Sequence, residues 1–459
     1  MLQEYEGKLA FTTDVWMFLN HHLFIALCMH LEHKDELLSM VLNVMELAKL
    51  HMEVHLVSAF AEVLEEFGIN EKEVHITCDN ASNNDKMIKE LVELLLGFDG
   101  ERSHVRCFLH VLSLIVKALL HEFNSSKPTT RRSATRARGK PAEDDNADAE
   151  EDEEDDNNAT DDLDPLREMT EKEQKQFEKD IRLVKLAIVK VFKDATLYFS
   201  HHDTPNLVHV IPVMDCIEET LMDASHGVKY SNAIAVACGL AKNILDKYYS
   251  LTDGSATYRI AMILHPRYKL SYFRKLKWTK GWQQTVHKLV KQEYANTYAG
   301  RFDGSQDKPE SNADDSSRPN SPSQSSTYEN NNSEGAWVDV DPSDDGRNLF
   351  NILDDFDADP DEDIRDKLEH YLTAPTQKVT DVIQWWKDRQ GIYPNLSRMA
   401  IDYLTIPATS IDVERLFSHG QLILSHVRSR LSAQTMRAIL CVGSWSVLNL
   451  VKPEEDLLA

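Results

Sequence analysis

The order of short apolar segments in the first quarter of the chain constrains the fold more than any other feature of the sequence. Two β-prone runs, residues 8–14 (KLAFTTD) and 23–30 (LFIALCMH), are followed by a third at residues 37–44. Runs of this length and composition are typical of buried strands. Residues 55–67 then carry apolar side chains at helical spacing, and Gly68 follows as a stop signal. The sequence therefore predicts three strands and then a helix.

Two more strand–helix pairs follow. Residues 74–78 are predicted to form a strand that ends at Asp79, and Ser82 or Asn83 is predicted to cap the next helix. A fifth strand is expected at residues 105–109, running into a helix over 110–123. Three strands, a helix and then strand–helix–strand–helix is the order of a ribonuclease-H-like mixed sheet. The fold class predicted is therefore α/β.

The acidic charge is confined to two segments. The 459 residues carry a net charge of −26. Residues 143–164 hold 14 acids and no base, and residues 302–366 hold 19 acids against 4 bases, so the remainder of the chain carries about +3. Segments so polar cannot bury enough apolar surface to fold, and we expect both to be disordered. Bulk charge therefore neither predicts nor excludes a nucleic-acid partner.

A basic run precedes the first acidic segment. It extends from Lys127 to Lys140 and includes Arg131, Arg132, Arg136 and Arg138. Such runs serve in nuclear import or contact phosphates, and a solvated linker is the alternative. Six scattered cysteines without a paired framework indicate a reduced intracellular chain. No run of about 18 apolar residues indicates a membrane span. Together these features predict a nuclear protein.

The composition divides the chain into five regions. We expect a first part of the ribonuclease-H-like core, a basic and acidic linker, a shortened helical insertion, an acidic linker, and a helical C-terminal segment that completes the core. Their predicted bounds are residues 8–123, 124–165, 166–299, 300–365 and 366–450.

Three carboxylates stand where metal-dependent chemistry could be built. Asp14 ends the first predicted strand, Asp79 ends the fourth, and Glu414 lies on a helix that Thr409 or Ser410 would cap. The first and fourth strands of such a sheet are neighbours, so the two aspartates should lie within about 4–7 Å, with Glu414 facing them. Oxygen ligands of this kind suit Mg²⁺. The alternatives are a turn residue at each strand end and a solvated glutamate.

The sequence around these acids resembles the hAT (hobo–Activator) family of transposases. Asp14-Val15-Trp16, then Asp79-Asn80-Ala81-Ser82-Asn83-Asn84, then Arg106-Cys107-Phe108-Leu109-His110 occur in that family's order. The stretch from Tyr403 to Trp445 resembles the family's C-terminal dimerisation region.

The resemblance implies roles for these residues. Asp14, Asp79 and Glu414 take the catalytic positions and would bind Mg²⁺ or Mn²⁺ in an active enzyme. Cys107 and His110 match a C-x-x-H element beside the site, and a packed core pair is the alternative. Dimerisation is expected to involve Trp385, Trp386, Leu416, Phe417, Met436, Ile439, Leu440 and Trp445, unless these side chains pack within the chain. The expected partner is a second copy or a related hAT protein, with DNA bound only loosely.

Two departures from the family pattern predict impaired activity. The scattered Cys and His residues do not form a zinc finger, so no structural zinc is expected. The sequence also lacks the Arg-Trp-Asn-Ser-like motif whose tryptophan stacks on a flipped base in the family. We therefore expect a transposon-derived protein that dimerises and has an impaired two-metal core. The alternatives are an active strand-transfer nuclease targeted in trans and a general ribonuclease-H-type nuclease.

Overall fold

The computed structural model describes nine stretches of the chain: residues 2–17, 22–34, 36–48, 52–124, 190–201, 206–226, 232–300, 364–423 and 431–451. Most of the two predicted linkers, 124–165 and 300–365, lies outside the described residues. The same is true of Arg131, Arg132, Arg136 and Arg138.

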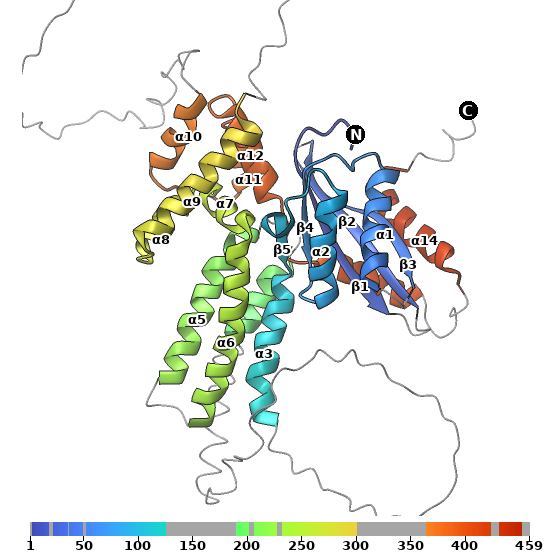
Figure 1. Cartoon of the computed structure of the whole chain (residues 1–459), viewed down its shortest axis with the longest axis horizontal. Coiled ribbons are helices and arrows are strands. Elements are labelled where there is room, and N and C mark those ends of the chain that lie inside the picture. Colours follow the sequence, from blue (N-terminus) through green and yellow to red (C-terminus); the bar gives the residue numbers. More distant parts are fainter. Residues whose placement is uncertain are drawn as a thin grey trace, which may run out of the picture.

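A five-stranded mixed sheet forms the N-terminal part (Figure 1). Its strands are β1 (Leu9–Met17), β2 (Leu23–His33), β3 (Glu36–Leu47), β4 (Val74–Cys78) and β5 (His104–Arg106). Their order is β3-β2-β1-β4-β5; β1 to β3 are antiparallel, and β4 and β5 run parallel to β1. This confirms the predicted ribonuclease-H-like class.

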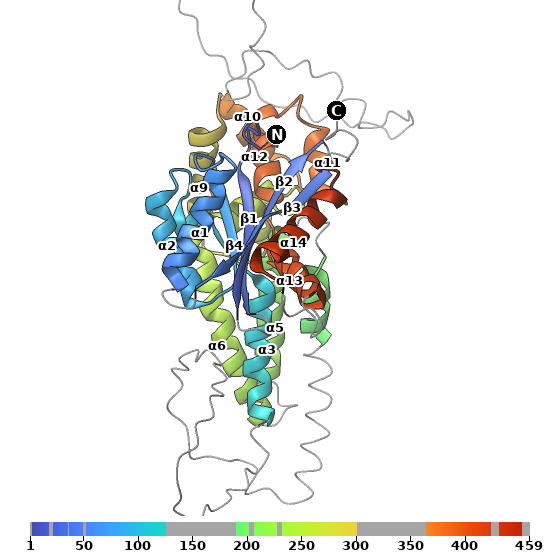
Figure 2. The same cartoon turned by 90° about the vertical axis from the view of Figure 1, so that its right-hand side faces the viewer.

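Helices cover both faces of the sheet (Figures 1 and 2). On one face lie α1 (Met52–Glu66) and α2 (Ser82–Leu94), which pack against Leu9 and Phe11 of β1. On the other lie α13 (Ile411–Ile423) and α14 (Ala433–Val447), which pack against Phe24 and Ala26 of β2. Because successive side chains of a strand point to opposite faces, β2 is buried on both and is apolar almost throughout.

The remaining helices form a layer beside the sheet (Figure 1). They are α3 (Phe108–Asn124), α5 (Val210–His226), α6 (Asn232–Gly254), α7 (Ala256–Leu264), α8 (Lys269–Lys275), α9 (Lys280–Glu293), α10 (Ile364–Thr373), α11 (Val382–Lys387) and α12 (Pro394–Leu404). Short turns also occur at Gly100–Ser103, Leu207–His209 and Tyr294–Tyr298. No helix in the described stretches is both long and apolar enough to cross a membrane.

Some sequence signals for the ends of helices and strands predicted the structure correctly, and others did not. Gly68 ends α1 with φ +64°, a conformation that glycine adopts without steric cost. The predicted cap of α2 is wrong: the N-cap is Ala81, whose side chain cannot accept a hydrogen bond, rather than Ser82 or Asn83. The fifth strand is shorter than expected, because the helix after it already begins at Phe108.

Two adjacent tryptophans of α11 have different environments. Trp386 is fully buried, and its indole N–H donates to the carbonyl of Leu264 at 2.9 Å. Trp385 is only partly buried, with its ring beneath the Arg389 guanidinium and its N–H bonded to Gln377. Trp386 is therefore part of the core of the helical layer.

We expect Trp386→Ala to destabilise the chain by about 4 kcal/mol, because it removes a fully buried indole and leaves a cavity. Trp385→Ala is the matched control and should cost about 1 kcal/mol. Chemical denaturation of both variants measures the difference. Equal losses would contradict the assignment of Trp386 alone to the core.

Candidate active site

The strand register places Asp14 and Asp79 at the same level of the sheet. On the adjacent parallel strands β1 and β4, Thr12 is paired with Thr77. Asp14 lies two residues beyond Thr12, and Asp79 lies two residues beyond Thr77. Since side chains two apart on a strand share a face, both carboxylates leave the sheet on the side of Thr12 and Thr77.

A short segment of the C-terminal region, residues 407–410, lies across this edge of the sheet. The Thr77 hydroxyl donates to the Pro407 carbonyl at 2.9 Å, and the Phe108 amide donates to the Ala408 carbonyl at 2.9 Å. The Thr409 hydroxyl donates to the carbonyl of Phe199. The Ser410 hydroxyl has no hydrogen-bond partner among the described residues, so the cap predicted at Thr409 or Ser410 is not confirmed.

Two further bonds hold the same segment. Asn206 accepts from the Ala408 amide at 3.1 Å through its side-chain oxygen, and the Ser410 amide donates to the Cys107 sulfur at 3.5 Å. Each bond contributes about 1 kcal/mol on its own. Together they fix the start of α13 relative to the sheet.

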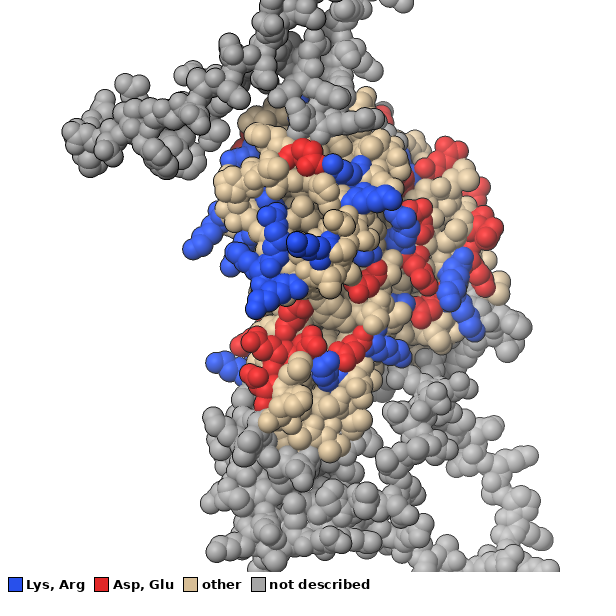
Figure 3. Space-filling view, turned by 60° about the vertical axis from the view of Figure 1, so that its left-hand side comes forward, with Lys and Arg blue, Asp and Glu red and all other residues tan. Residues whose placement is uncertain are grey.

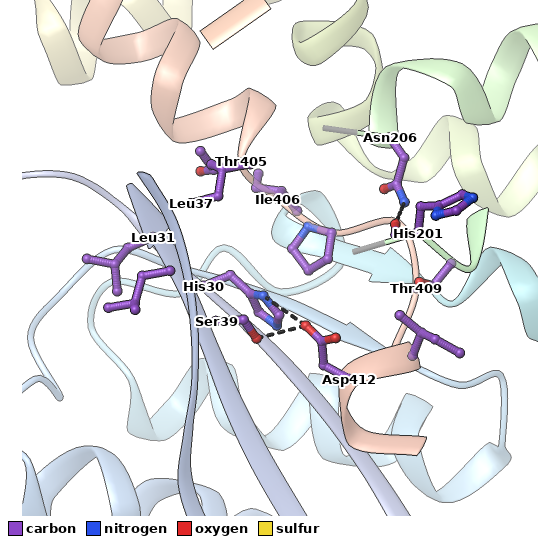
Figure 4. Close-up of a pocket in the computed structure, with 13 residues that line it drawn as sticks. His30, Leu31, Leu37, Ser39, His201, Asn206, Thr405, Ile406, Thr409 and Asp412 are labelled. Atoms are coloured by element: carbon purple, nitrogen blue, oxygen red, sulfur yellow. Dashed lines mark hydrogen bonds and ion pairs between the residues drawn. The ribbon is translucent and has the colours of Figure 1, made fainter. Parts of the chain in front are cut away.

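Asp412, in the first turn of α13, forms a second anchor (Figure 4). Its Oδ2 accepts from the Ser39 hydroxyl at 2.7 Å and lies 3.7 Å from Nδ1 of His30. The other ring nitrogen of His30 is 2.9 Å from the Thr12 hydroxyl. These groups line a cavity of about 70 Å³, far below the several hundred Å³ that enclose a nucleotide-sized ligand. The contacts of Asp412 with Ser39 and His30 beside this cavity therefore connect α13 to the sheet.

Glu414 follows one half-turn later on the same helix. Phe417, further along α13, stacks on Trp16 with ring centroids 5.5 Å apart. Trp16 is two residues beyond Asp14 and shares its face of β1. The helix that carries Glu414 therefore lies over the face from which Asp14 projects.

The three acids interact electrostatically. Burial, followed by the negative charges of Asp79 and Glu414, raises the pKa of Asp14 to about 7. Burial and Asp79 also raise the pKa of Glu414. Carboxylates lose their preference for the charged form in this way when solvent is removed and like charges approach. The side chains at positions 14, 79 and 414 therefore lie close enough to influence one another electrostatically.

Local donors already satisfy part of this charge. Asp79 Oδ1 accepts from the Ala81 amide at 3.1 Å and from the Asn84 side-chain amide, while Asp14 Oδ1 accepts from the Val15 amide. Nearby, Arg106 pairs with Asp85 at 2.9 Å. Asn84 and Arg106 belong to the sequence motifs that resemble the hAT family. Their contacts with Asp79 and Asp85 could not be derived from the spacing of residues alone.

Cys107 and His110 have separate surroundings. Cys107 is buried and bonded to the 407–410 segment, and burial raises the pKa of its thiol to about 11. A thiol held neutral is a poor metal ligand, because the thiolate is the form that binds. His110 is partly exposed, with Nδ1 3.9 Å from Asp79 Oδ2. Only His110 therefore faces the acids.

The acids fit a divalent cation in chemistry but do not form a complete set of ligands. The three carboxylates are hard oxygen donors, and a cation would relieve the repulsion that contributes to the raised pKa values of Asp14 and Glu414. Within the described part of the chain, however, no group of three or more His, Cys, Asp or Glu side chains is placed to hold a metal. Asp79 would bind a cation through Oδ2, because its Oδ1 already accepts from Ala81 and Asn84.

Most residues expected at a dimer interface pack within the chain. Leu416, Phe417, Met436 and Leu440 are buried against the sheet, and Trp445 donates its indole N–H to the Val41 carbonyl at 2.6 Å. Trp386 is buried as described above. Ile439 is the exception, with 41% of its surface exposed.

The sheet order and its helical cover define a ribonuclease-H-like fold. Asp79 directly follows β4, whereas Asp14 lies within the neighbouring parallel strand β1, which continues to Met17 rather than ending at Asp14 as predicted. Residues 12–101 match the ZBED1 RNase-like domain, and residues 367–446 match the hAT family C-terminal dimerisation region. The chain is therefore a hAT-transposase-related protein with an RNase-like domain and a dimerisation region.

Individual relatives agree with this. A protein of Zea mays named for the AC transposase is 20% identical over 97% of this chain and 57% of its own length. A Talaromyces stipitatus protein named as a transcriptional regulator is 22% identical over 98% of this chain and 55% of its own length. The Drosophila melanogaster Hobo transposase is 37% identical over 11% of this chain and 8% of its own length. The chain thus spans little more than half the length of the first two relatives.

The raised pKa of Asp14 has a consequence for stability. The folded value of about 7 lies above the ordinary value of 3.8, so between these values the folded state binds more protons than the unfolded state. Stability must then fall as the pH rises through this window. We expect Asp14→Asn to match the wild type near pH 4 and to be about 2 kcal/mol more stable at pH 8. Denaturation in chelator across this range is the measurement, and a gain that does not vary with pH would contradict it.

Proposed function

We propose that this protein is a transposase-derived chain that self-associates through its C-terminal region and carries an impaired two-metal core. The observation that carries the first part is an exposed apolar face on α14. This helix lies almost entirely within the matched dimerisation region, and the residues on its other face are used within the chain.

The two faces of α14 differ clearly. Met436, Leu440 and Cys441 are buried against the sheet. On the outward face, Ile439, Val442 and Val447 are 41%, 46% and 81% exposed. Val442 lies three positions and Val447 eight positions beyond Ile439, spacings at which residues share one side of a helix, so these three form a stripe, which we call the α14 stripe. Apolar surface of this kind at a helical edge is typical of a protein–protein contact.

A second copy is the occupant that fits the α14 stripe. Between Ile439 and Val447 the stripe contains Gly443, and a Cβ added there would meet no atom within 4 Å. A small residue on an exposed helix face lets another backbone approach closely. Two copies related by a two-fold axis would each present the same stripe, which makes the contact self-complementary.

We expect the wild-type chain to sediment as a dimer or larger species, and Ile439→Glu/Val442→Glu to shift it towards monomer by at least about tenfold in dissociation constant, because two desolvated charges oppose the contact. Leu96→Glu is the control, since Leu96 is 91% exposed and lies outside the matched region. Both variants should keep the wild-type melting temperature. A monomeric wild type, or an unaffected double variant, would refute the assignment.

The second part of the proposal concerns Asp14, Asp79 and Glu414. These are the residues that would hold Mg²⁺ or Mn²⁺, which when bound activates a nucleophile and stabilises the leaving oxygen of a phosphodiester. The chain's own groups orient this site: the 407–410 segment positions Glu414, and Asn84 and His110 face Asp79. The convergence of the acids favours an active nuclease as the second candidate.

Two observations support impairment over full activity. Asp79 has its Oδ1 engaged by two donors, so without rearrangement it offers a cation only Oδ2 rather than both oxygens. The sequence also lacks the Arg-Trp-Asn-Ser-like motif of the family, and misplacing the substrate by about 1 Å costs on the order of 10²-fold in rate.

Relatives named for BED zinc fingers in rice and Arabidopsis, together with the basic run at 127–140, lead us to propose the nucleus as the compartment.

We expect no sustained Mg²⁺- or Mn²⁺-dependent cleavage of terminal-inverted-repeat DNA by the purified protein. Mn²⁺ should nevertheless raise the melting temperature of the wild type, because ligand binding stabilises the folded state. Asp14→Ala should abolish that rise. Cleavage that Asp14→Ala removes would establish the second candidate instead, and a Mn²⁺ effect that survives Asp14→Ala would refute the metal site.

A further inference from the structure

The described part of the chain concentrates positive charge in one place. Residues 256–293, from α7 to the end of α9, contain nine Lys or Arg residues and a single acid, Glu293. Glu293 is mostly buried and pairs with Lys8 at 2.6 Å. A chain with a net charge of −26 therefore carries a segment of +8 whose only acid is neutralised from elsewhere.

Five of these cations, on or beside α8 and α9, are exposed, and together we call them the α8–α9 basic surface: Arg274, Lys275, Lys277, Lys280 and Lys288. None has an ion-pair partner among the described residues. Figure 3 shows Lys and Arg gathered on this side of the molecule. It lies on the side of the helical layer away from the sheet (Figure 1). The α8–α9 basic surface therefore consists of cations without an ion-pair partner among the described residues, and it lies away from Asp14, Asp79 and Glu414.

The cations of α9 follow one face of the helix. Lys280, Gln284 and Lys288 are exposed and four residues apart, whereas Val286 and Val290 on the other side are buried. Residues at this spacing line up along a helix. Gln284, which lies between the two lysines, is uncharged, so no acidic side chain interrupts this row of exposed residues on α9.

An aromatic cluster holds the two helices in a fixed relation. Phe273 is buried, with its ring centroid 5.2 Å from Trp278 and 5.6 Å from Trp282. The Arg259 guanidinium lies 5.4 Å from the Trp282 ring, and Thr279 caps α9 by accepting from the Trp282 amide. The cations therefore project from a packed hairpin.

Lys277 occupies an unusual backbone position. It follows the end of α8 with φ +58°, in the left-handed region where helices usually place glycine. A lysine there sacrifices local stability relative to glycine. Its side chain is exposed, so packing does not account for the residue type.

We propose that the α8–α9 basic surface binds the phosphate backbone of duplex DNA. A rigid row of unpaired cations without a pocket suits a long polyanion and offers no selection among bases. An anionic membrane is disfavoured, because Leu276 at 46% exposure is the large exposed apolar residue of this surface and interfacial helices need several. This binding depends neither on self-association nor on a metal at the carboxylates.

The test is fluorescence anisotropy of the full chain with a labelled duplex of random sequence, titrated at several salt concentrations in chelator. Lys280→Glu/Lys288→Glu should weaken binding by at least about tenfold and flatten the slope of log Kd against log salt by about 2, since each phosphate contact contributes roughly one unit. Lys277→Gly should weaken binding by about twofold to fivefold with an unchanged or raised melting temperature. That variant separates binding from folding.

The matched control is Lys86→Glu/Lys89→Glu on α2, which changes the net charge equally at two exposed lysines far from the surface. It should bind within about twofold of the wild type. Equal losses in both double variants would show a bulk charge effect and overturn the assignment. So would wild-type binding by Lys280→Glu/Lys288→Glu, or binding of polyglutamate or anionic vesicles without binding of duplex. Sedimentation of the same samples shows whether self-association is retained, so failure of this surface is distinguishable from failure of the α14 stripe.

Discussion

The 407–410 segment is the constraint on which the carboxylate edge depends. Nearly all of the chain separates Asp14 from Glu414, yet five hydrogen bonds from the sheet, α3 and the helical layer hold this segment across the ends of β1 and β4. One of the partners, Thr77, lies on β4, two residues before Asp79. The core therefore closes only when the C-terminal region docks, and the same docking delivers α13, α14 and the outward stripe on α14. The proposed self-association and the proposed site would therefore depend on the same docking.

Burying Asp14 near two other acids at this edge of the sheet costs free energy. Asp14 is largely buried beside two other acids, and its raised pKa records the free energy that this placement costs. Groups held this way are common at functional sites, because a cation or substrate recovers the cost on binding. Ordinary packing elsewhere offsets it: α1 and α2 seal one face of the sheet, and Phe417 on Trp16 seals part of the other. The acids persist where simple stability would favour amides.

Much of this was accessible from the sequence, and the failures have identifiable causes. The apolar runs specified the strands, and strand order alone made Asp14 and Asp79 neighbours. The cap of α2 differs from the prediction because Ser82, which has capping chemistry, is already the first residue of the helix, while Asp79 accepts from the amide of the N-cap residue Ala81. Trp386 could not be separated from Trp385 by type, because only the tertiary fold places Leu264 beside one of them. The net charge of the chain does not reveal the α8–α9 basic surface, because acidic residues elsewhere balance the excess of Lys and Arg at residues 256–293.

The central claim is that residues from the two ends of the chain form one electrostatic site, and a carboxyl titration tests it most directly. Selective ¹³C labelling of aspartate, with Asp14→Asn to assign the signal, gives the pKa of Asp14 in the folded chain. The pKa should fall in Asp79→Asn and also, by a smaller amount, in Glu414→Gln, because both neighbours raise it in the wild type. An Asp14 titration that is unchanged in Glu414→Gln would show that α13 does not complete the site, and would contradict the account.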